Sequence, residues 1–234
     1  MKFGVLKYPG GHGDAELVHI LRQYFNKEVR EVWYLEESYA DLGALFIGGG
    51  FPCNHLEPGH QCLDESPALH YLETFVSRGG YVIGFGNGFR LLCETGLLQG
   101  ELKLNSTGRF ICKHVYIKAE NQLNAITADL DPDEVFRTPI ATAFGNFEAD
   151  EKVLVGMRQE GQILFRYCDY EGRITESVNE TGSKDNIAGI SNPEHTVFGM
   201  IPQPERAVSE FRRDADGKRI LTTLLQRIES SYNG

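Results

Sequence analysis

The stretch Tyr81-Val82-Ile83-Gly84-Phe85-Gly86-Asn87-Gly88-Phe89-Arg90 decides the fold. An apolar run typical of a buried strand meets a Gly-x-Gly-x-Gly turn, and a helical pattern begins at Phe89. Strand, tight turn and helix in this order are typical of a nucleophile elbow, whose middle residue stands exposed at the carboxyl end of a parallel sheet. That residue is Gly86, where nucleophilic catalysis would need Ser or Cys. The sequence therefore predicts the frame of a catalytic site without its nucleophile.

Around this turn, the first hundred residues alternate strand and helix patterns. One helix follows Asp14, which we expect to be its N-cap, and another starts at Ser66-Pro67 in the order N-cap, N1. Alternation of this kind is typical of a parallel sheet covered on both faces, with its glycine turns gathered at one edge. The strands predicted before the elbow strand are residues 2–6, 29–35 and 44–47.

The second half of the chain is richer in strands. An amphipathic pattern from Ile220 to Ile228 predicts a final helix that docks on the sheet, and the polar residues 170–184 are expected to form a mobile surface loop. No linker or repeat interrupts the pattern, so we expect a single domain over residues 1–234. The strands predicted here are residues 109–117, 136–143, 162–167, 187–191 and 197–201.

Composition excludes several classes of function. The 234 residues carry a net charge of -10, which argues against nonspecific binding to the phosphates of nucleic acid. No apolar run approaches the length of a membrane span, and the first residues are typical of a strand rather than a signal peptide. The odd number of cysteines, without metal-ligand spacing, indicates reduced thiols in a cytoplasm.

Several motifs in order carry a family resemblance: Tyr8-Pro9-Gly10, Gly48-Gly49-Gly50-Phe51, Asn87-Gly88-Phe89, Arg109-Phe110-Ile111-Cys112, Pro139-Ile140-Ala141, Ile187-Ala188-Gly189-Ile190 and Pro204-Glu205-Arg206-Ala207-Val208. In these motifs the chain resembles the class I glutamine amidotransferases and, more narrowly, the glutaminase subunits of phosphoribosylformylglycinamidine synthase. The resemblance implies a flavodoxin-like α/β fold. Its central sheet would be mostly parallel, with helices on both faces and an additional antiparallel strand region.

The resemblance also implies a site, which this chain has largely lost. In the family a cysteine attacks the amide of glutamine, a histidine acts as base and a glutamate orients the histidine. These roles fall on Gly86, Gln203 and Glu205, so only the glutamate is kept. The family's oxyanion donors and pocket wall fall on Gly49, Gly50, Phe51 and Asn87.

Other departures surround the same pocket. The family's glutamine after Asn-Gly-Phe is Arg90, and its histidine after Pro-Ile-Ala is Thr142. The family's Gly-Glu-Gly corresponds to residues 143–145, and its Asn-Cys pair to His12-Gly13. Changes on every side of the pocket, with the strand and turn motifs intact, indicate drift or repurposing after catalysis was abandoned.

Two of these residues carry specific hypotheses. The guanidinium of Arg90 can lean back toward the start of its helix, where it would pair with Glu205 or with an anionic ligand. The alternative is that Arg90 points to solvent. Gln203 is expected to donate a hydrogen bond to Glu205 or to a backbone carbonyl.

The sequence gives little support for another residue that replaces the nucleophile or the base. Cys93 lies two turns beyond Gly86, about 10 Å along a helix, and Cys53 follows the glycine loop. His12 and His55 lack ligand spacing, so surface roles are expected rather than a metal site or a displaced base. The glycine loops are not followed by a phosphate-loop lysine, and we expect neither metal nor cofactor.

Two functions remain open at this stage. The first is an interaction protein: a glutaminase-like subunit without activity that docks on a purine-pathway synthase subunit, or holds a small anionic or amide ligand in the vestigial pocket. The second is a working amidotransferase subunit that supplies ammonia for purine biosynthesis through a non-standard site.

Overall fold

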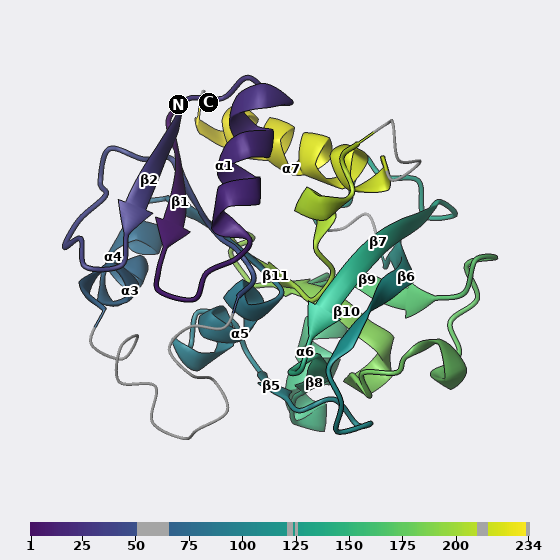
Figure 1. Cartoon of the computed structure of the whole chain (residues 1–234). Coiled ribbons are helices and arrows are strands. Elements are labelled where there is room, and N and C mark those ends of the chain that lie inside the picture. The colour runs from purple at the N-terminus through teal and green to yellow at the C-terminus, as the bar shows by residue number, and fades with distance from the viewer. Residues whose placement is uncertain (51–65, 121–123, 125, 210–214, 233–234) are drawn as a thin grey trace.

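A nine-stranded sheet forms the framework of the residues that the computed structural model describes, which are 1–50, 66–120, 124, 126–209 and 215–232 (Figure 1). The strand order is β2-β1-β3-β4-β11-β10-β9-β6-β7, and a separate two-stranded sheet pairs β5 with β8. The strands are β1 (Phe3–Lys7), β2 (Val29–Trp33), β3 (Ala44–Ile47), β4 (Tyr81–Phe85), β5 (Glu101–Lys103), β6 (Ile111–Ala119), β7 (Val135–Thr142), β8 (Asn146–Glu148), β9 (Ile163–Cys168), β10 (Ile187–Ser191) and β11 (Val197–Met200).

The large sheet has a parallel and an antiparallel half. Strands β2, β1, β3, β4 and β11 are parallel to one another. Strands β10, β9, β6 and β7 continue the sheet in antiparallel fashion. This confirms the predicted α/β fold, including its additional antiparallel region. The elbow strand β4 lies between β3 and β11, so the turn at Gly86 is central in the parallel half.

Helices cover both faces of the parallel half. Figure 1 shows α1 and α7 on one side of the sheet and α3, α4 and α5 on the other. Helix α7 packs Ile220 and Leu224 near Met200 of β11, whereas α5 packs Phe89 against Gly199 of the same strand. The helices are α1 (Asp14–Gln23), α3 (Pro67–His70), α4 (Leu72–Ser77), α5 (Asn87–Glu94), α6 (Glu151–Gln159) and α7 (Asp216–Tyr232), with short 3-10 turns η1 (Glu176–Val178), η2 (Lys184–Asn186) and η3 (Pro204–Arg206).

Of the two predicted N-caps, the one before α3 is confirmed and the one before α1 is not. The hydroxyl of Ser66 accepts a hydrogen bond from the Leu69 N–H at 3.3 Å, and Pro67 follows at N1, as predicted. Asp14 is not the N-cap: Gly13 precedes the helix without a side-chain bond, and Asp14 is the first helical residue. The carboxylate of Asp14 still lies where the helix dipole favours negative charge.

Two segments of the second half differ from expectation. Helix α6 was not predicted, although Leu154 and Met157 form its buried stripe. The segment 170–184 was expected to be a mobile loop, yet it is anchored to the loop after β5. The Ser106 N–H donates to the Thr181 carbonyl at 2.8 Å, and Lys113 forms an ion pair with Glu180.

The elbow depends on close backbone approach at two glycines. A Cβ on Gly88 would lie 2.1 Å from the Ile47 carbonyl oxygen of β3, and a Cβ on Gly84 would lie 2.6 Å from the Gly88 carbonyl carbon. Both contacts are with backbone, which cannot rotate away as a side chain can. The strand-to-helix turn is therefore packed so closely on β3 that only glycine fits at these positions.

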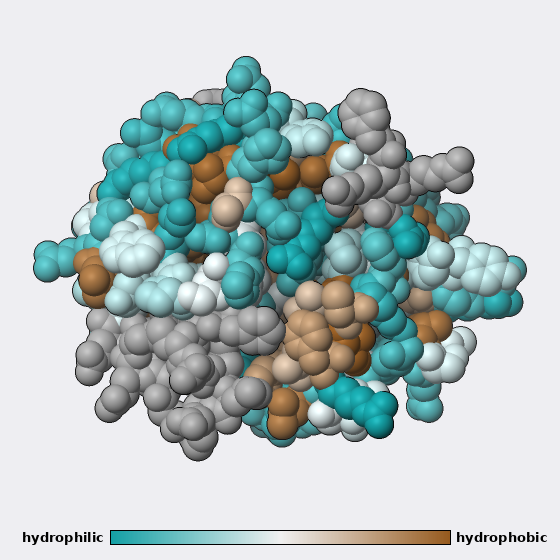
Figure 2. All heavy atoms as spheres, in the orientation of Figure 1, coloured by the Kyte–Doolittle hydropathy of each residue, from teal (hydrophilic) through white to brown (hydrophobic). Residues whose placement is uncertain are grey.

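The hydropathy of the helices and of one face of the molecule can be followed in the structure. Within the described ranges, no helix combines the length and the apolar character that crossing a bilayer requires. Figure 2 shows a face on which hydrophilic atoms predominate and hydrophobic atoms form separate patches.

We predict that Gly88→Ala destabilises the fold by about 3 kcal/mol, because the added methyl group must displace the backbone of β3. The control is Gly156→Ala in α6, where nothing lies within 4 Å of the added Cβ. Since alanine loses less backbone entropy on folding than glycine, the control should stabilise the protein by about 0.5–1 kcal/mol. Urea denaturation measures both, and equal effects would contradict the packing described here.

Candidate functional site

Gly86 has the backbone conformation of an elbow residue. It lies between β4 and α5 with φ 56° and ψ -115°. Its N–H donates to the Met200 carbonyl at 2.8 Å, and its carbonyl accepts from the Phe89 N–H at 3.2 Å. This region of φ and ψ is strained for a residue with a side chain and open to glycine. The turn predicted from the glycine spacing is thus present, and residue 86 contributes only backbone to it.

Gln203 lies directly over the elbow. Its side-chain nitrogen would be 2.8 Å from a Cβ on Gly86 and also 2.8 Å from a Cβ on Gly49. Gln203 is 2% exposed, and its backbone N–H donates to the Pro139 carbonyl at 2.9 Å. The structure therefore brings Gln203 next to both Gly86 and the glycine loop, which the sequence predicted to share one site.

The glycine loop is held by backbone hydrogen bonds from residues 11–13 and by one side-chain hydroxyl, that of Tyr8. The Gly49 carbonyl accepts from the N–H groups of His12 at 3.1 Å and Gly13 at 2.9 Å. A bridge joins Gly50 to Gly11, and the Tyr8 hydroxyl donates to the Gly48 carbonyl at 2.8 Å. The expected gathering of glycine turns at one edge is confirmed.

Two further residues of the predicted pocket are Phe51 and Asn87. Phe51 lies outside the described residues. Asn87 is the first residue of α5, directly after the elbow, and its side-chain nitrogen is buried without a hydrogen-bond partner among the described residues.

Glu205 is a buried carboxyl group without a partner. It is 2% exposed, and neither of its oxygens accepts a hydrogen bond from any described residue. Burial raises the pKa of the Glu205 carboxyl to about 8, and the nearby Arg206 offsets this only in part. The Arg206 guanidinium is engaged by Glu16 of α1 at 2.7 Å. Gln203 therefore does not donate to Glu205, the first of the two partners expected for it.

Arg90 neither pairs with Glu205 nor points to solvent, whereas its expected pairing with an anionic ligand stays a prediction. Its Nε donates to the Glu94 carboxylate at 2.7 Å, and its guanidinium lies 3.9 Å from the centre of the Phe144 ring. Only 12% of the side chain is exposed, so Arg90 does not point to solvent. It does not pair with Glu205 either, because both carboxyl oxygens of Glu205 lack a partner. A cation over an aromatic face is itself a stabilising contact.

Thr142 is part of a polar cluster that closes the end of β7. Its hydroxyl accepts from the Phe144 N–H at 3.0 Å, and its carbonyl accepts from the Asn105 amide at 2.9 Å. Asn105 also accepts from the Gly145 N–H at 2.8 Å. Sequence reasoning missed the roles of Asn105 and Phe144, since no local pattern brings a residue after β5 to the end of β7.

None of the thiols in the described ranges is suited to replace the missing nucleophile. Burial raises the pKa of the Cys93 thiol to about 12 and that of Cys168 to about 11, so both stay protonated. Cys112 is exposed on β6, whereas Cys53 and His55 lie outside the described residues. Within the described part of the chain, no group of His, Cys, Asp and Glu has metal-binding geometry.

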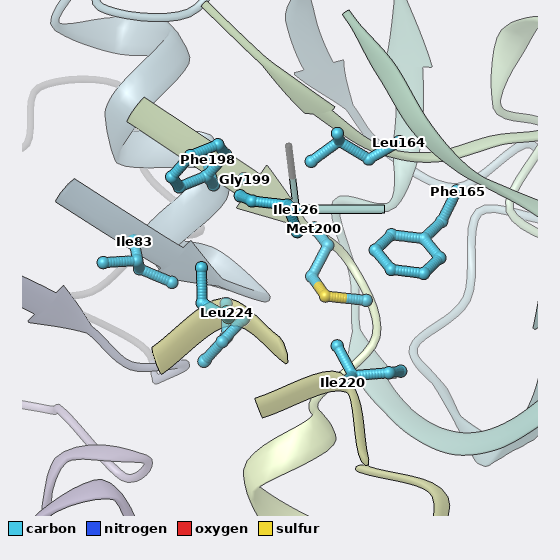
Figure 3. A pocket seen from close by; sticks show the side chains of 10 residues that line it. Ile83, Ile126, Leu164, Phe165, Phe198, Gly199, Met200, Ile220 and Leu224 are labelled. Atoms are coloured by element: carbon cyan, nitrogen blue, oxygen red, sulfur yellow. The ribbon is translucent and has the colours of Figure 1, made fainter. Parts of the chain in front are cut away.

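A separate cavity between the sheet and α7 is wholly apolar. Figure 3 shows Met200, Phe165 and Ile220 pointing toward one another in it. It offers no side-chain nitrogen or oxygen to orient a polar ligand, so we regard it as a packing gap. The residues that line it are Ile83, Phe85, Ile126, Leu164, Phe165, Phe198, Gly199, Met200, Ile220 and Leu224.

A central parallel strand that turns sharply into a helix, with a glycine loop beside the turn, defines the class of α/β domains built around a nucleophile elbow. Within this class, the chain belongs to the CobB/CobQ-like glutamine amidotransferase family, whose profile matches residues 5–221.

Similarity to known proteins extends over nearly the whole chain. It is 39% identical over 226 residues to phosphoribosylformylglycinamidine synthase subunit PurQ of Aquifex aeolicus, covering 96% of this chain and 99% of the relative. Identity to the same subunit of Bradyrhizobium diazoefficiens is 34% over 232 residues, with 99% and 100% covered. In the structure of PurLQS from Thermotoga maritima, one chain superposes with a TM-score of 0.81 at 30% identity, covering 96% of this chain and 97% of that one. The family resemblance is confirmed.

We predict that Glu205→Gln removes a pH-dependent loss of stability. Folding raises the pKa of this carboxyl from 4.5 to about 8, so the folded state keeps a proton that the unfolded chain releases. Stability therefore falls as pH rises between these values and stays low above them. The advantage of the variant in free energy of unfolding should grow by up to roughly 1.4 kcal/mol per pH unit between pH 5 and 8.

Urea denaturation across this pH range measures the effect. Glu73→Gln, at an exposed position of α4, is the matched control for losing a glutamate. A stability difference between Glu205→Gln and the parent that stays constant with pH would contradict the assignment.

Proposed function

We propose that this chain is a glutaminase-like subunit that does not hydrolyse glutamine and acts by binding a protein partner. The observation that carries the proposal is the geometry at Gly86. The residue at the elbow has no side chain, and the carboxamide of Gln203 fills the space in which a nucleophile would stand.

The chemistry of the substituted residues supports the loss of activity. Glycine cannot form a thioester, and the carboxamide of Gln203 cannot accept a proton near neutral pH. Without a histidine, Glu205 has no base to orient. In a serine hydrolase the loss of the nucleophile alone lowers turnover by about a million-fold.

Contacts between residues that differ from the family's pattern support the proposal that the folded chain still has a role. Gln203 covers Gly86, and Phe144 packs under Arg90. Replacements that contact each other keep the former pocket filled, so the fold around it is preserved. A chain without any remaining role would not be expected to keep such contacts.

The relatives suggest which partner to test. They are named as subunits of phosphoribosylformylglycinamidine synthase, and the Thermotoga maritima structure is named PurLQS. We propose that this chain docks on a synthase subunit of the purine pathway in the cytoplasm, as a scaffold or regulator. A sensor of a small anionic or amide ligand would need an open pocket, and Gln203 argues against one.

The second candidate is a working amidotransferase subunit. The full-length similarity to named synthase subunits favours it. It would need a nucleophile other than residue 86, and the thiol of Cys93 is protonated at neutral pH. We therefore place the interaction role first.

The test measures ammonia release from L-glutamine by the purified chain, alone and with a purine synthase subunit from the same genome. We expect release at the level of a heat-inactivated control, together with co-purification of the two proteins. Sustained release above that level would contradict the proposal. If a Cys53→Ser, Cys93→Ser double variant were still active, a thiol at either position would be excluded as the source.

A further inference from the structure

We infer that Gln203 is an internal plug that decides what the former pocket admits: its side-chain carboxamide occupies the space that any small molecule must enter to reach residue 86. This inference rests on the proposed function and deepens it. In this inference Gln203 keeps small amides out of the site. This exclusion is separate from the lack of a nucleophile at residue 86.

The position of the plug is defined from two sides. The same nitrogen of Gln203 faces the Cα of Gly86 on the elbow and the Cα of Gly49 on the glycine loop. A carbon attached to either glycine would lie 2.8 Å from that nitrogen, closer than non-bonded carbon and nitrogen atoms pack. The carboxamide therefore lies in the gap between loop and elbow, and a second group enters this gap only if the Gln203 side chain turns away.

Burial and backbone anchoring keep the plug in this place. Gln203 is 2% exposed, and its N–H donates to the Pro139 carbonyl of β7 at 2.9 Å. This bond fixes the direction in which the side chain leaves the backbone. Because the residue follows β11 directly through Ile201 and Pro202, the neighbouring parallel strands β4 and β11 hold Gly86 and Gln203 in register.

The plug is held by packing more than by hydrogen bonds. The side-chain oxygen of Gln203 has no partner among the described residues, and neither carboxyl oxygen of Glu205 has one. A buried carboxamide that lacks its acceptor bond is less firmly fixed than one with every bond made. Shortening this side chain should therefore open the gap without breaking a network on which the fold depends.

A reactive cysteine introduced at the elbow reports whether the gap is open. In Gly86→Cys the thiol lies beneath the carboxamide, whereas in Gly86→Cys with Gln203→Ala the cover is gone. Gly86→Cys with Gln203→Met keeps an unbranched side chain of matching length and is the size control. Iodoacetamide, which itself carries a primary amide, is the probe, and peptide mass spectrometry follows alkylation at each cysteine separately.

We expect the introduced thiol at residue 86 to react at least about tenfold faster when residue 203 is alanine than when it is glutamine or methionine. The exposed Cys112 should react at the same rate in every variant and serves as the internal reference. Equal alkylation rates for the introduced thiol in all three variants would contradict the inference that Gln203 blocks the pocket.

A second measurement avoids any cysteine at the strained elbow. Titration of acetamide into the unaltered chain, Gln203→Ala and Gln203→Met, followed by NMR, should show saturable shifts for Gln203→Ala only. Saturable binding to the unaltered chain would also overturn the inference. If the proposed function is wrong, the chain releases ammonia from L-glutamine. If only the plug is wrong, the alkylation rates are equal in all variants or acetamide binds the unaltered chain, so the two failures are distinguishable.

Discussion

The constraint on which the structure depends is the backbone conformation of the turn between β4 and α5. Gly86 holds φ 56° and ψ -115°, and Gly84 and Gly88 let the turn pack against its own helix and against β3. This geometry exists to present one side chain at the carboxyl end of a sheet. In this chain residue 86 is glycine, which adopts this geometry without the strain that a side chain would bring, so the residue contributes only backbone to the turn.

The contacts around the turn leave little empty space beside Gly86. A side chain removed from a buried site leaves a cavity that costs stability unless neighbours fill it. Here the carboxamide of Gln203 enters the space at Gly86, and the guanidinium of Arg90 covers the ring of Phe144. Glu205 is an unfavourable residue at this place, because its carboxyl is buried without a hydrogen-bond partner among the described residues and burial raises its pKa.

The sequence allowed prediction where the physical requirement is local. Glycine spacing at residues 84, 86 and 88 predicted the turn, and Ser66 before Pro67 predicted a capped helix, because both depend on a few adjacent residues. The contact of Arg90 with Phe144 was not predictable, since it depends on where the end of β7 meets α5. The cap at Asp14 was misplaced by one residue, because the same residue type is favoured at the cap and in the first turn.

The measurement that tests the account most directly is a double-mutant cycle between Gly86→Ala and Gln203→Ala, followed by urea denaturation. Gly86→Ala alone is expected to lose stability both to backbone strain and to contact with the carboxamide of Gln203. With alanine at residue 203 only the strain remains, so the two changes together should cost less than their sum by about 1 kcal/mol. Additive effects would mean that Gln203 does not fill the place of the lost side chain, and would contradict the account.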